Sequence, residues 1–192
     1  MLRKADICEV ERIMEILADG RGALTALGVN QWQRGYPHRN IIEQDIRSGE
    51  SYVVEADDGS LIATAMIGFR GEKGYRSIQD GTWLTDSPDD SPCYAVVHRV
   101  AVETARKGNG AASLILNEAE RIVSQNGYES IRIETHEDNT PMRSLLAKEG
   151  YTRCGTIYIT HDGECNSARM AYEKLIADGE GSDVVNQACH ST

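Results

Sequence analysis

Apolar residues near the start of the chain, from Ile7 to Leu17, recur at the 3.6-residue period of an amphipathic helix. Asp6 and Glu9 occupy the positions of a capping box, in which each side chain binds the other residue's backbone N–H group. Gly20 follows the last apolar residue of the period, and glycine commonly ends a helix. The pattern therefore predicts a first helix that begins after Asp6 and ends at Gly20.

The remaining elements follow from the same reading of period and turn residues. Alternating or short apolar runs predict strands at residues 3–5, 51–56, 61–70, 94–102, 130–135, 151–160 and 167–174. Helical spacing predicts helices at residues 22–28, 110–126 and 140–149, and one more that is capped by Asn40 and ends near Gly49. Residues 71–92 carry Gly, Asp and Pro and predict a loop whose length favours a binding role.

The order of these elements predicts a mixed α/β (α+β) fold. Helices come first, antiparallel hairpins follow, and residues 94–135 form a strand–helix–strand unit with one parallel crossover. A chain of 192 residues fits one domain. We expect this domain at residues 1–176, followed by a polar, unpatterned tail at residues 177–192.

Composition narrows the classes of partner. The net charge of −10 disfavours nucleic acid, because phosphates would be repelled over the whole surface, and it favours a cationic small molecule. No apolar run is long enough for a membrane span, and the charged start does not resemble a signal peptide. Five scattered cysteines form no C-x-x-C pair, so we expect no metal site, reduced thiols and a cytoplasmic location.

The stretch "ARKGNGAAS" links a predicted strand to a predicted helix. Gly108 and Gly110 allow the backbone to bend and to approach a ligand closely. The helix start offers N–H groups without helical partners, and Arg106 and Lys107 add positive charge, which together suit a phosphate group. An ordinary strand-to-helix turn remains the alternative. The stretch matches neither a P-loop nor a dinucleotide fingerprint, which argues against an ATP-binding module.

Four segments resemble the GNAT superfamily of N-acetyltransferases. "HRVAVETARKGNGAASLIL" resembles its donor-binding motif, with Lys107 where the family usually has Arg or Gln. "IRIETHEDNTPMRSLLAKEGYTRCGTIYI" is similar to the next strand, helix and strand, and "SARMAYEKL" to the closing strand. "QWQRGYPHRNIIEQDIRSGESYVV" is similar to the N-terminal part of one bacterial subgroup. The resemblance covers residues Leu2 to Leu175.

This resemblance implies a mostly antiparallel, twisted sheet of six to seven strands with about four helices. It also implies an enzyme that transfers acetyl from acetyl-CoA to a primary amine of a small molecule or peptide, without a metal. Dimers are common in the family, so the resemblance also makes a homodimer an expectation. The residues expected to bind the pantetheine arm are Val100, Ala101, Val102 and Asn139, although Asn139 also suits a helix N-cap. Those expected to cradle the pyrophosphate are Lys107, Gly108, Asn109, Gly110, Ala111 and Ala112.

The reaction needs a base, because an alkylamine is mostly protonated at neutral pH and only its neutral form attacks a thioester. His98 is the first candidate, acting through water, since its position matches a histidine of the arylalkylamine branch of the superfamily. Glu134, near the end of the neighbouring strand, is the rival, and His136 is a third candidate. A buried structural histidine and an ion-paired glutamate are the alternatives to these catalytic roles.

Two further features concern the acceptor and the leaving group. Trp32 and Tyr36 lie in a region that usually forms the wall of the acceptor pocket, although they could equally pack on the core. Leu146 stands where many family members have a tyrosine that protonates the leaving thiolate. This departure leaves open a second function, that of a catalytically silent domain that binds or senses acyl-CoA.

Overall fold

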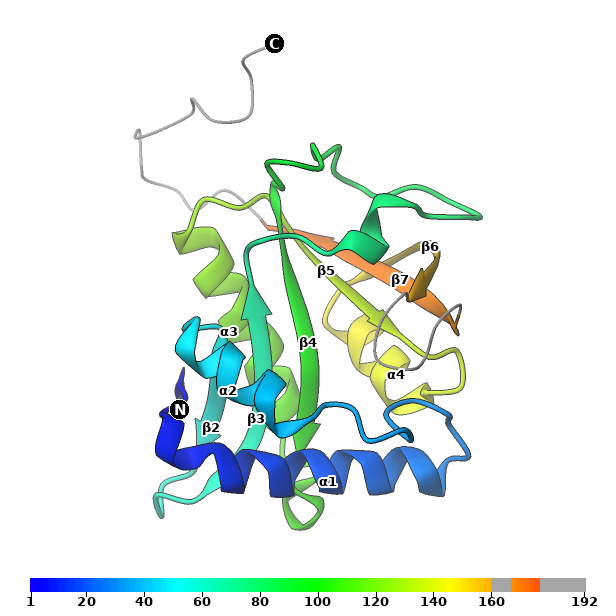
Figure 1. Cartoon of the computed structure of the whole chain (residues 1–192). Coiled ribbons are helices and arrows are strands. Elements are labelled where there is room, and N and C mark those ends of the chain that lie inside the picture. The colour runs from blue at the N-terminus through cyan, green and yellow to red at the C-terminus, as the bar shows by residue number, and fades with distance from the viewer. Residues whose placement is uncertain (160–166, 177–192) are drawn as a thin grey trace.

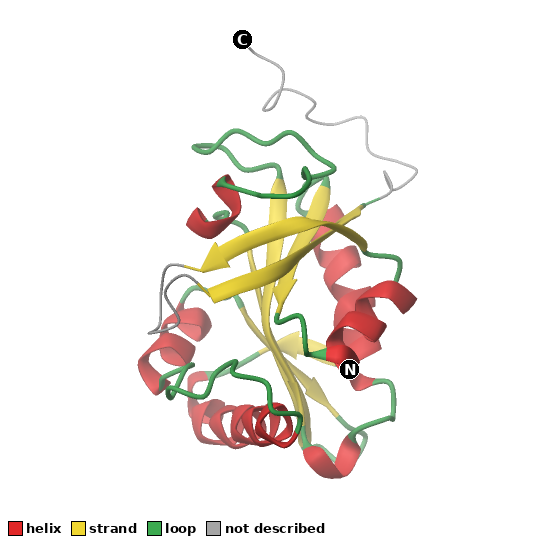
Figure 2. Cartoon of the chain, turned by 90° about the vertical axis from the view of Figure 1, so that its right-hand side faces the viewer, coloured by secondary structure: helices red, strands yellow, loops and turns green. Residues whose placement is uncertain are grey.

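The computed structural model describes residues 1–159 and 167–176 (Figure 1). Within these residues the chain forms one seven-stranded sheet, in the order β1-β2-β3-β4-β5-β7-β6, with helices on both faces (Figure 2). Neighbouring strands are antiparallel except β4 and β5, which are parallel. The predicted mixed α/β fold, with its one parallel crossover, is confirmed.

The elements have the following bounds. The strands are β1 (Leu2–Lys4), β2 (Ser51–Glu55), β3 (Leu61–Gly68), β4 (Tyr94–Val102), β5 (Ser130–Thr135), β6 (Thr152–Ile159) and β7 (Ser167–Leu175). The helices are α1 (Val10–Ala26), α2 (Arg39–Arg47), α3 (Ala111–Gln125) and α4 (Thr140–Lys148). Three short 3₁₀ turns are η1 (Ile7–Glu9), η2 (Lys73–Arg76) and η3 (Thr104–Arg106).

The two faces of the sheet are covered by different helices. Helices α1 and α2 bury apolar residues such as Ile13 and Ile42 against Val53 and Ala101 on one face. Helices α3 and α4 bury Leu116 and Leu146 in the core on the other face. No helix in residues 1–159 or 167–176 is long and apolar enough to cross a membrane.

The predicted end of the first helix at Gly20 is wrong. Helix α1 runs without a break from Val10 to Ala26, so no separate helix exists at residues 22–28. A side chain at Gly20 would place its Cβ 3.1 Å from the Cβ of Ala101 and 3.3 Å from the ring of Trp32. The glycine is therefore required where α1 crosses β4 closely, and it does not serve to stop the helix.

Other boundaries differ by a few residues from those expected. The capping box of Asp6 and Glu9 is present, but it opens turn η1, which leads directly into α1. Helix α2 begins after His38, two residues before the predicted cap Asn40. The turn between β6 and β7 and the expected tail fall on residues 160–166 and 177–192, outside the described residues.

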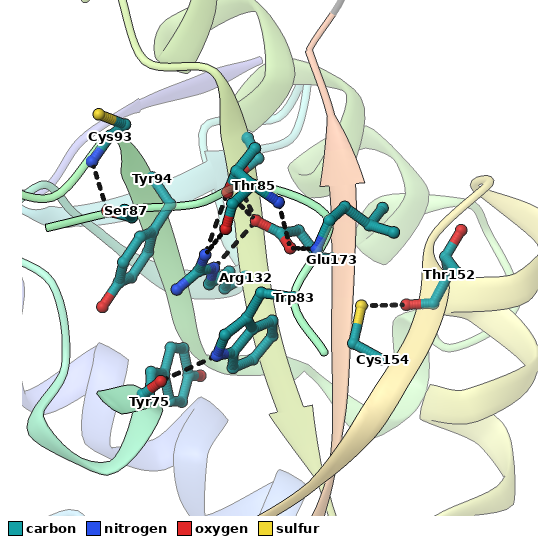
Figure 3. A network of polar contacts seen from close by, with 12 residues as sticks. Tyr75, Trp83, Thr85, Ser87, Cys93, Tyr94, Arg132, Thr152, Cys154 and Glu173 are labelled. Atoms are coloured by element: carbon teal, nitrogen blue, oxygen red, sulfur yellow. Dashed lines mark hydrogen bonds and ion pairs between the residues drawn. The ribbon is translucent and has the colours of Figure 1, made fainter. Parts of the chain in front are cut away.

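The long loop before β4 is fastened to the sheet by one buried ion pair (Figure 3). The Arg132 guanidinium donates to the Glu173 carboxylate at 2.9 Å and to the Thr85 carbonyl at 2.7 Å. It also lies over the rings of Trp83 and Tyr94, at 4.3 and 3.8 Å from their centroids. This network closes the loop over the ends of β5 and β7.

Glu173 is fully buried and stays ionised through its partners. Burial raises the pKa of Glu173, but hydrogen bonds from Ser130, Thr85 and Arg132 outweigh this effect and hold the pKa below its usual range. The folded state therefore binds a proton at this carboxyl less readily than the unfolded state does. The contribution to stability is present above the unfolded pKa of about 4.3 and is lost as the pH falls through the folded pKa.

We expect Glu173→Gln to lower the free energy of unfolding by roughly 3–5 kcal/mol at pH 7, because Arg132 would remain buried without its counter-charge. The difference from wild type should begin to narrow as the pH falls below the unfolded pKa of about 4.3 and should be lost as the pH falls through the lower folded pKa. Urea unfolding at pH 7 and at a series of pH values below the unfolded pKa measures both effects. Glu15→Gln, whose carboxylate is largely exposed, is the matched control. An equal difference at every pH would contradict the ionic account.

Candidate active site

The strand pair at the centre of the sheet separates part of the way along its length. Strand β4 pairs with β5 only from Tyr94 to Val96, opposite Ser130 to Arg132. Beyond these residues the two strands do not pair with each other. Figure 1 shows the two strands diverging beyond this point. A cavity of about 540 Å³ lies there, lined by residues of β4, β5, α1, α3 and α4.

A β-bulge shapes the β4 side of this cavity. Between the pairs Thr64–Ala101 and Met66–His98, β3 contributes one residue and β4 contributes two, Arg99 and Val100. Arg99 has φ +56°, which is a strained conformation for a large side chain. The extra residue leaves backbone groups of the strand outside the ladder, beside the cavity.

The glycine turn closes one end of the same cavity. Gly108 and Gly110 both have φ +81°, and a Cβ at either position would meet nothing within 4 Å, so the turn is open. Gly110 is the N-cap of α3 and supplies no side-chain cap to the first N–H groups of the helix. With Arg106 and Lys107 in the lining, the turn suits an anion.

Most residues expected to bind the donor lie around this one cavity. Its lining includes Val100, Ala101, Val102, Lys107, Gly108, Gly110, Ala111, Ala112 and Asn139, and of the expected set it omits only Asn109. The side chain of Asn139 also accepts a hydrogen bond from the Met142 N–H at 3.3 Å, so it caps α4. Capping and lining are thus compatible at this residue.

A second cavity of about 210 Å³ adjoins the first. Six side chains line both cavities: Gln31, Trp32, Tyr36, His98, Arg99 and Glu134. The structure therefore brings together the two candidate bases and the two aromatic residues expected at the acceptor wall. His136 is not among the lining residues of either cavity, and its ring instead accepts a hydrogen bond from the Asp138 N–H at 3.1 Å.

His98 is mostly buried and lies beside a loop residue that the sequence did not single out. Its Nε2 atom is 3.7 Å from Oε2 of Glu72, and its ring centroid is 6.0 Å from that of Tyr75. Burial, with smaller contributions from Glu134 and Glu72, raises the pKa of Tyr75 well above its usual range. Both neighbours come from the long loop at residues 71–92. In the sequence, only the length of that loop indicated that its residues could contribute to a binding site.

Glu134 faces a buried arginine on β7. Its Oε2 atom is 3.5 Å from Nε of Arg169, whose residue is only 1% exposed. At this separation the two groups form an ion pair, but the Oε2 atom of Glu134 accepts no hydrogen bond from a described residue. The carboxylate therefore keeps capacity to accept a hydrogen bond at the junction of the two cavities.

Arg99 joins the acceptor side of the site to the sheet. Its guanidinium lies 2.7 Å from Asp45 of α2 and donates to the Tyr36 hydroxyl at 2.6 Å. Burial raises the pKa of Asp45, although the charge and hydrogen bond of Arg99 act against this. Neither Arg99 nor Asp45 could be singled out from sequence, because each looks like an ordinary member of its strand or helix.

A comparison with protein families settles the affiliation of the chain. The model of the acetyltransferase (GNAT) family matches residues 11–151. The chain belongs to the GNAT acetyltransferase family. The assignment of the chain as an acetyltransferase, predicted from its motifs, is confirmed.

Solved GNAT structures share the fold along nearly the whole chain. A GNAT acetyltransferase from Streptococcus agalactiae is 30% identical, with a TM-score of 0.79 over 91% of this chain and 94% of that one. PaiA N-acetyltransferase from Thermoplasma acidophilum, solved with coenzyme A, is 16% identical, with a TM-score of 0.63 over 91% and 98%. Ribosomal-protein-alanine N-acetyltransferase from Brucella melitensis is 17% identical, with a TM-score of 0.62 over 91% and 99%. A comparison with functionally curated proteins gave no significant match.

The described part of this GNAT protein holds no group of three or more His, Cys, Asp or Glu side chains suited to a metal ion. The polar side chains around the junction are instead arranged as ion pairs and aromatic contacts. Among these ion pairs, the Arg99 guanidinium and the Asp45 carboxylate lie 2.7 Å apart beside the two cavities.

We expect Asp45→Asn to lower the free energy of unfolding by roughly 3–5 kcal/mol, because it leaves the Arg99 guanidinium buried without a counter-charge. The loss should be accompanied by looser attachment of the loop that carries Tyr36. Thermal and urea unfolding measure the first effect, and proteolysis between α1 and α2 measures the second. Asp57→Asn, in the exposed hairpin turn, is the control, and equal stability of the two variants would contradict this role.

Proposed function

We propose that this GNAT protein transfers acetyl from acetyl-CoA to a primary amine of a small molecule or peptide by direct attack on the thioester. The observation that supports this most strongly is the junction of two cavities at the break in the β4–β5 ladder. One cavity ends at the glycine turn, and the side chains of His98 and Glu134 lie where the two cavities adjoin. A donor and an acceptor that enter from these two sides would meet at the bulge.

The donor half would bind largely through backbone groups. The N–H groups at the start of α3 and in the turn around Gly108 and Gly110 suit a pyrophosphate, and Lys107 adds positive charge. The backbone of Val100 to Val102 suits the amide groups of a pantetheine arm, because this part of β4 has no ladder partner in β5. The same unpaired strand edge can donate to the oxyanion that develops on the acetyl oxygen.

The acetyl thioester supplies an electrophilic carbonyl. The amine nitrogen forms the new C–N bond, the C–S bond breaks, and the sulfur leaves with the electron pair of that bond. The proton that the nitrogen loses as the amide forms passes through water to the thiolate and gives the free thiol. His98 would take the proton of the ammonium group through a water molecule before the attack. Glu134 would hold the ammonium group nearby and is the rival for the role of base.

No acid is required at the usual tyrosine position. Leu146 is fully buried in the core beneath α4, so it contributes nothing to proton transfer. A thiol leaving group with a pKa near 8.5, by analogy with cysteine, needs little protonation. Leu146 also favours the second candidate, a domain that binds acyl-CoA without turnover, and release of free thiol in the presence of amines distinguishes the two.

Binding of acetyl-CoA should depend on the glycine turn. We expect calorimetric titration to show micromolar binding to wild type, no binding of ATP, and loss of acetyl-CoA binding in Gly110→Trp. Gly127→Trp is the matched control, since Gly127 also has positive φ with open space around it but lies at the other end of α3. Failure of wild type to bind acetyl-CoA would remove the basis of the proposed function.

The choice of base can be tested separately from donor binding. We expect His98→Gln to lower kcat by roughly 10²–10⁴, with little change in acetyl-CoA affinity, because glutamine keeps a polar side chain but cannot accept the proton. Thiol release at saturating amine measures this, and Glu118→Gln on the exposed side of α3 is the control. A larger loss in Glu134→Gln than in His98→Gln would assign the base to Glu134.

A further inference from the structure

Four polar atoms in the side chains that line both cavities have no hydrogen-bond partner among the described residues. They are Oε1 of Gln31, Nε2 of His98, Nε of Arg99 and Oε2 of Glu134. Each belongs to a side chain that lines both cavities. Buried polar groups in folded proteins are nearly always hydrogen-bonded, so four such atoms around one cavity indicate a polar ligand.

The chemistry of these atoms describes what that ligand carries. Oε1 of Gln31 and Oε2 of Glu134 can only accept hydrogen bonds, and Nε2 of His98 accepts when the ring carries its proton on Nδ1. A primary ammonium group donates three hydrogen bonds, so it matches this set. Nε of Arg99 can only donate, so it requires an oxygen of the ligand close to the ammonium group.

Arg99 bears two energetic costs at one position. Its backbone is strained at φ +56°, and its Nε–H is a buried donor without an acceptor in the described part of the chain. Both features destabilise the free protein unless a ligand satisfies the donor. Its other two guanidinium nitrogens are held by Tyr36 and Asp45, which fixes the direction of the remaining N–H group.

The charges at the cavity agree with an ammonium group. Arg99 is paired with Asp45, and Arg169 is paired with Glu134, so both guanidinium charges are already balanced. Glu72 adds a further negative charge 3.7 Å from His98. The volume of about 210 Å³ lies below the usual range for drug-sized ligands, so it suits a small acceptor.

Resting on the proposed transfer to an amine, we infer that the acceptor is a small α-amino acid or α-amino amide. Its ammonium group is received by Glu134, Gln31 and His98, and its carboxylate or carboxamide oxygen accepts from Nε of Arg99. An amine without that oxygen leaves the Arg99 donor unpaired, and leaving a buried donor unpaired is costly. Arg99 is therefore a specificity residue for the group beside the amine.

The test compares matched acceptors with and without a carboxylate or carboxamide group beside the amine. Alanine, leucine and phenylalanine are each set against their amides and against ethylamine, 3-methylbutylamine and 2-phenylethylamine, and kcat/KM is measured as thiol release from acetyl-CoA. We expect the acid or the amide to exceed the plain amine roughly tenfold or more in the best set. The comparison of each amino acid with its amide shows whether the site prefers a charged carboxylate oxygen or a neutral amide oxygen.

Two variants link the preference to Arg99. Arg99→Lys keeps the positive charge beside Asp45 but has no N–H group at the position of Nε, so the preference should fall to about twofold or less. Arg121→Lys, on the exposed side of α3, should keep the wild-type preference. Calorimetry with acetyl-CoA verifies that the Arg99→Lys fold is intact, and the wild-type comparison decides the acceptor class even if that variant does not fold.

The outcomes separate this inference from the proposed function. Turnover of plain amines as fast as that of the matched acids and amides overturns the inference and leaves the transferase proposal standing. A preference for acids and amides that persists in a folded Arg99→Lys variant overturns the role of Arg99. Acetyl-CoA binding without thiol release from any acceptor of the three sets overturns both the inference and transfer to small amines.

Discussion

Strand β4 carries one residue more than β3 between two of their pairings, and this bulge is the constraint on which the site depends. An extra residue shifts the alternation of side chains, so that His98 and Ala101, three positions apart, both reach the face covered by α1 and η2. In a regular strand, His98 would share its face with Val100, and Ala101 would lie on the opposite face. The bulge therefore places the candidate base beside the smaller cavity while the later part of β4 continues along the larger cavity.

The bulge also accounts for the attachment of the loop before α2. Arg99 projects from the bulge to Asp45 of α2 and to Tyr36 of the preceding loop. Arg132 does the same for the other loop, through Thr85 and the rings of Trp83 and Tyr94 (Figure 3). In each case one buried arginine holds a loop whose own backbone makes few ladder contacts, so the acceptor side is ordered by side chains rather than by sheet pairing.

The sequence predicted those features whose cause is local. The β4–α3–β5 unit follows from apolar runs and from Gly108 and Gly110, because strand, turn and helix start leave their patterns in adjacent residues. Gly20 was misread because its reason is the close crossing of α1 and β4, which involves Ala101 some eighty positions later. Glu72 was missed for the same kind of reason, since its role depends on which loop covers His98.

The two halves of the site differ in what carries their specificity. In the proposed donor half the ligand would be bound mainly by backbone N–H groups of the turn, which every residue type except proline supplies. The acceptor half consists of side chains from the loop before α2, the loop before β4 and the β4 bulge, and each can change without disturbing the sheet. Likeness of fold to other GNAT proteins therefore carries information about the donor, whereas the acceptor must be read from this chain's own residues, above all from Arg99 and Glu134.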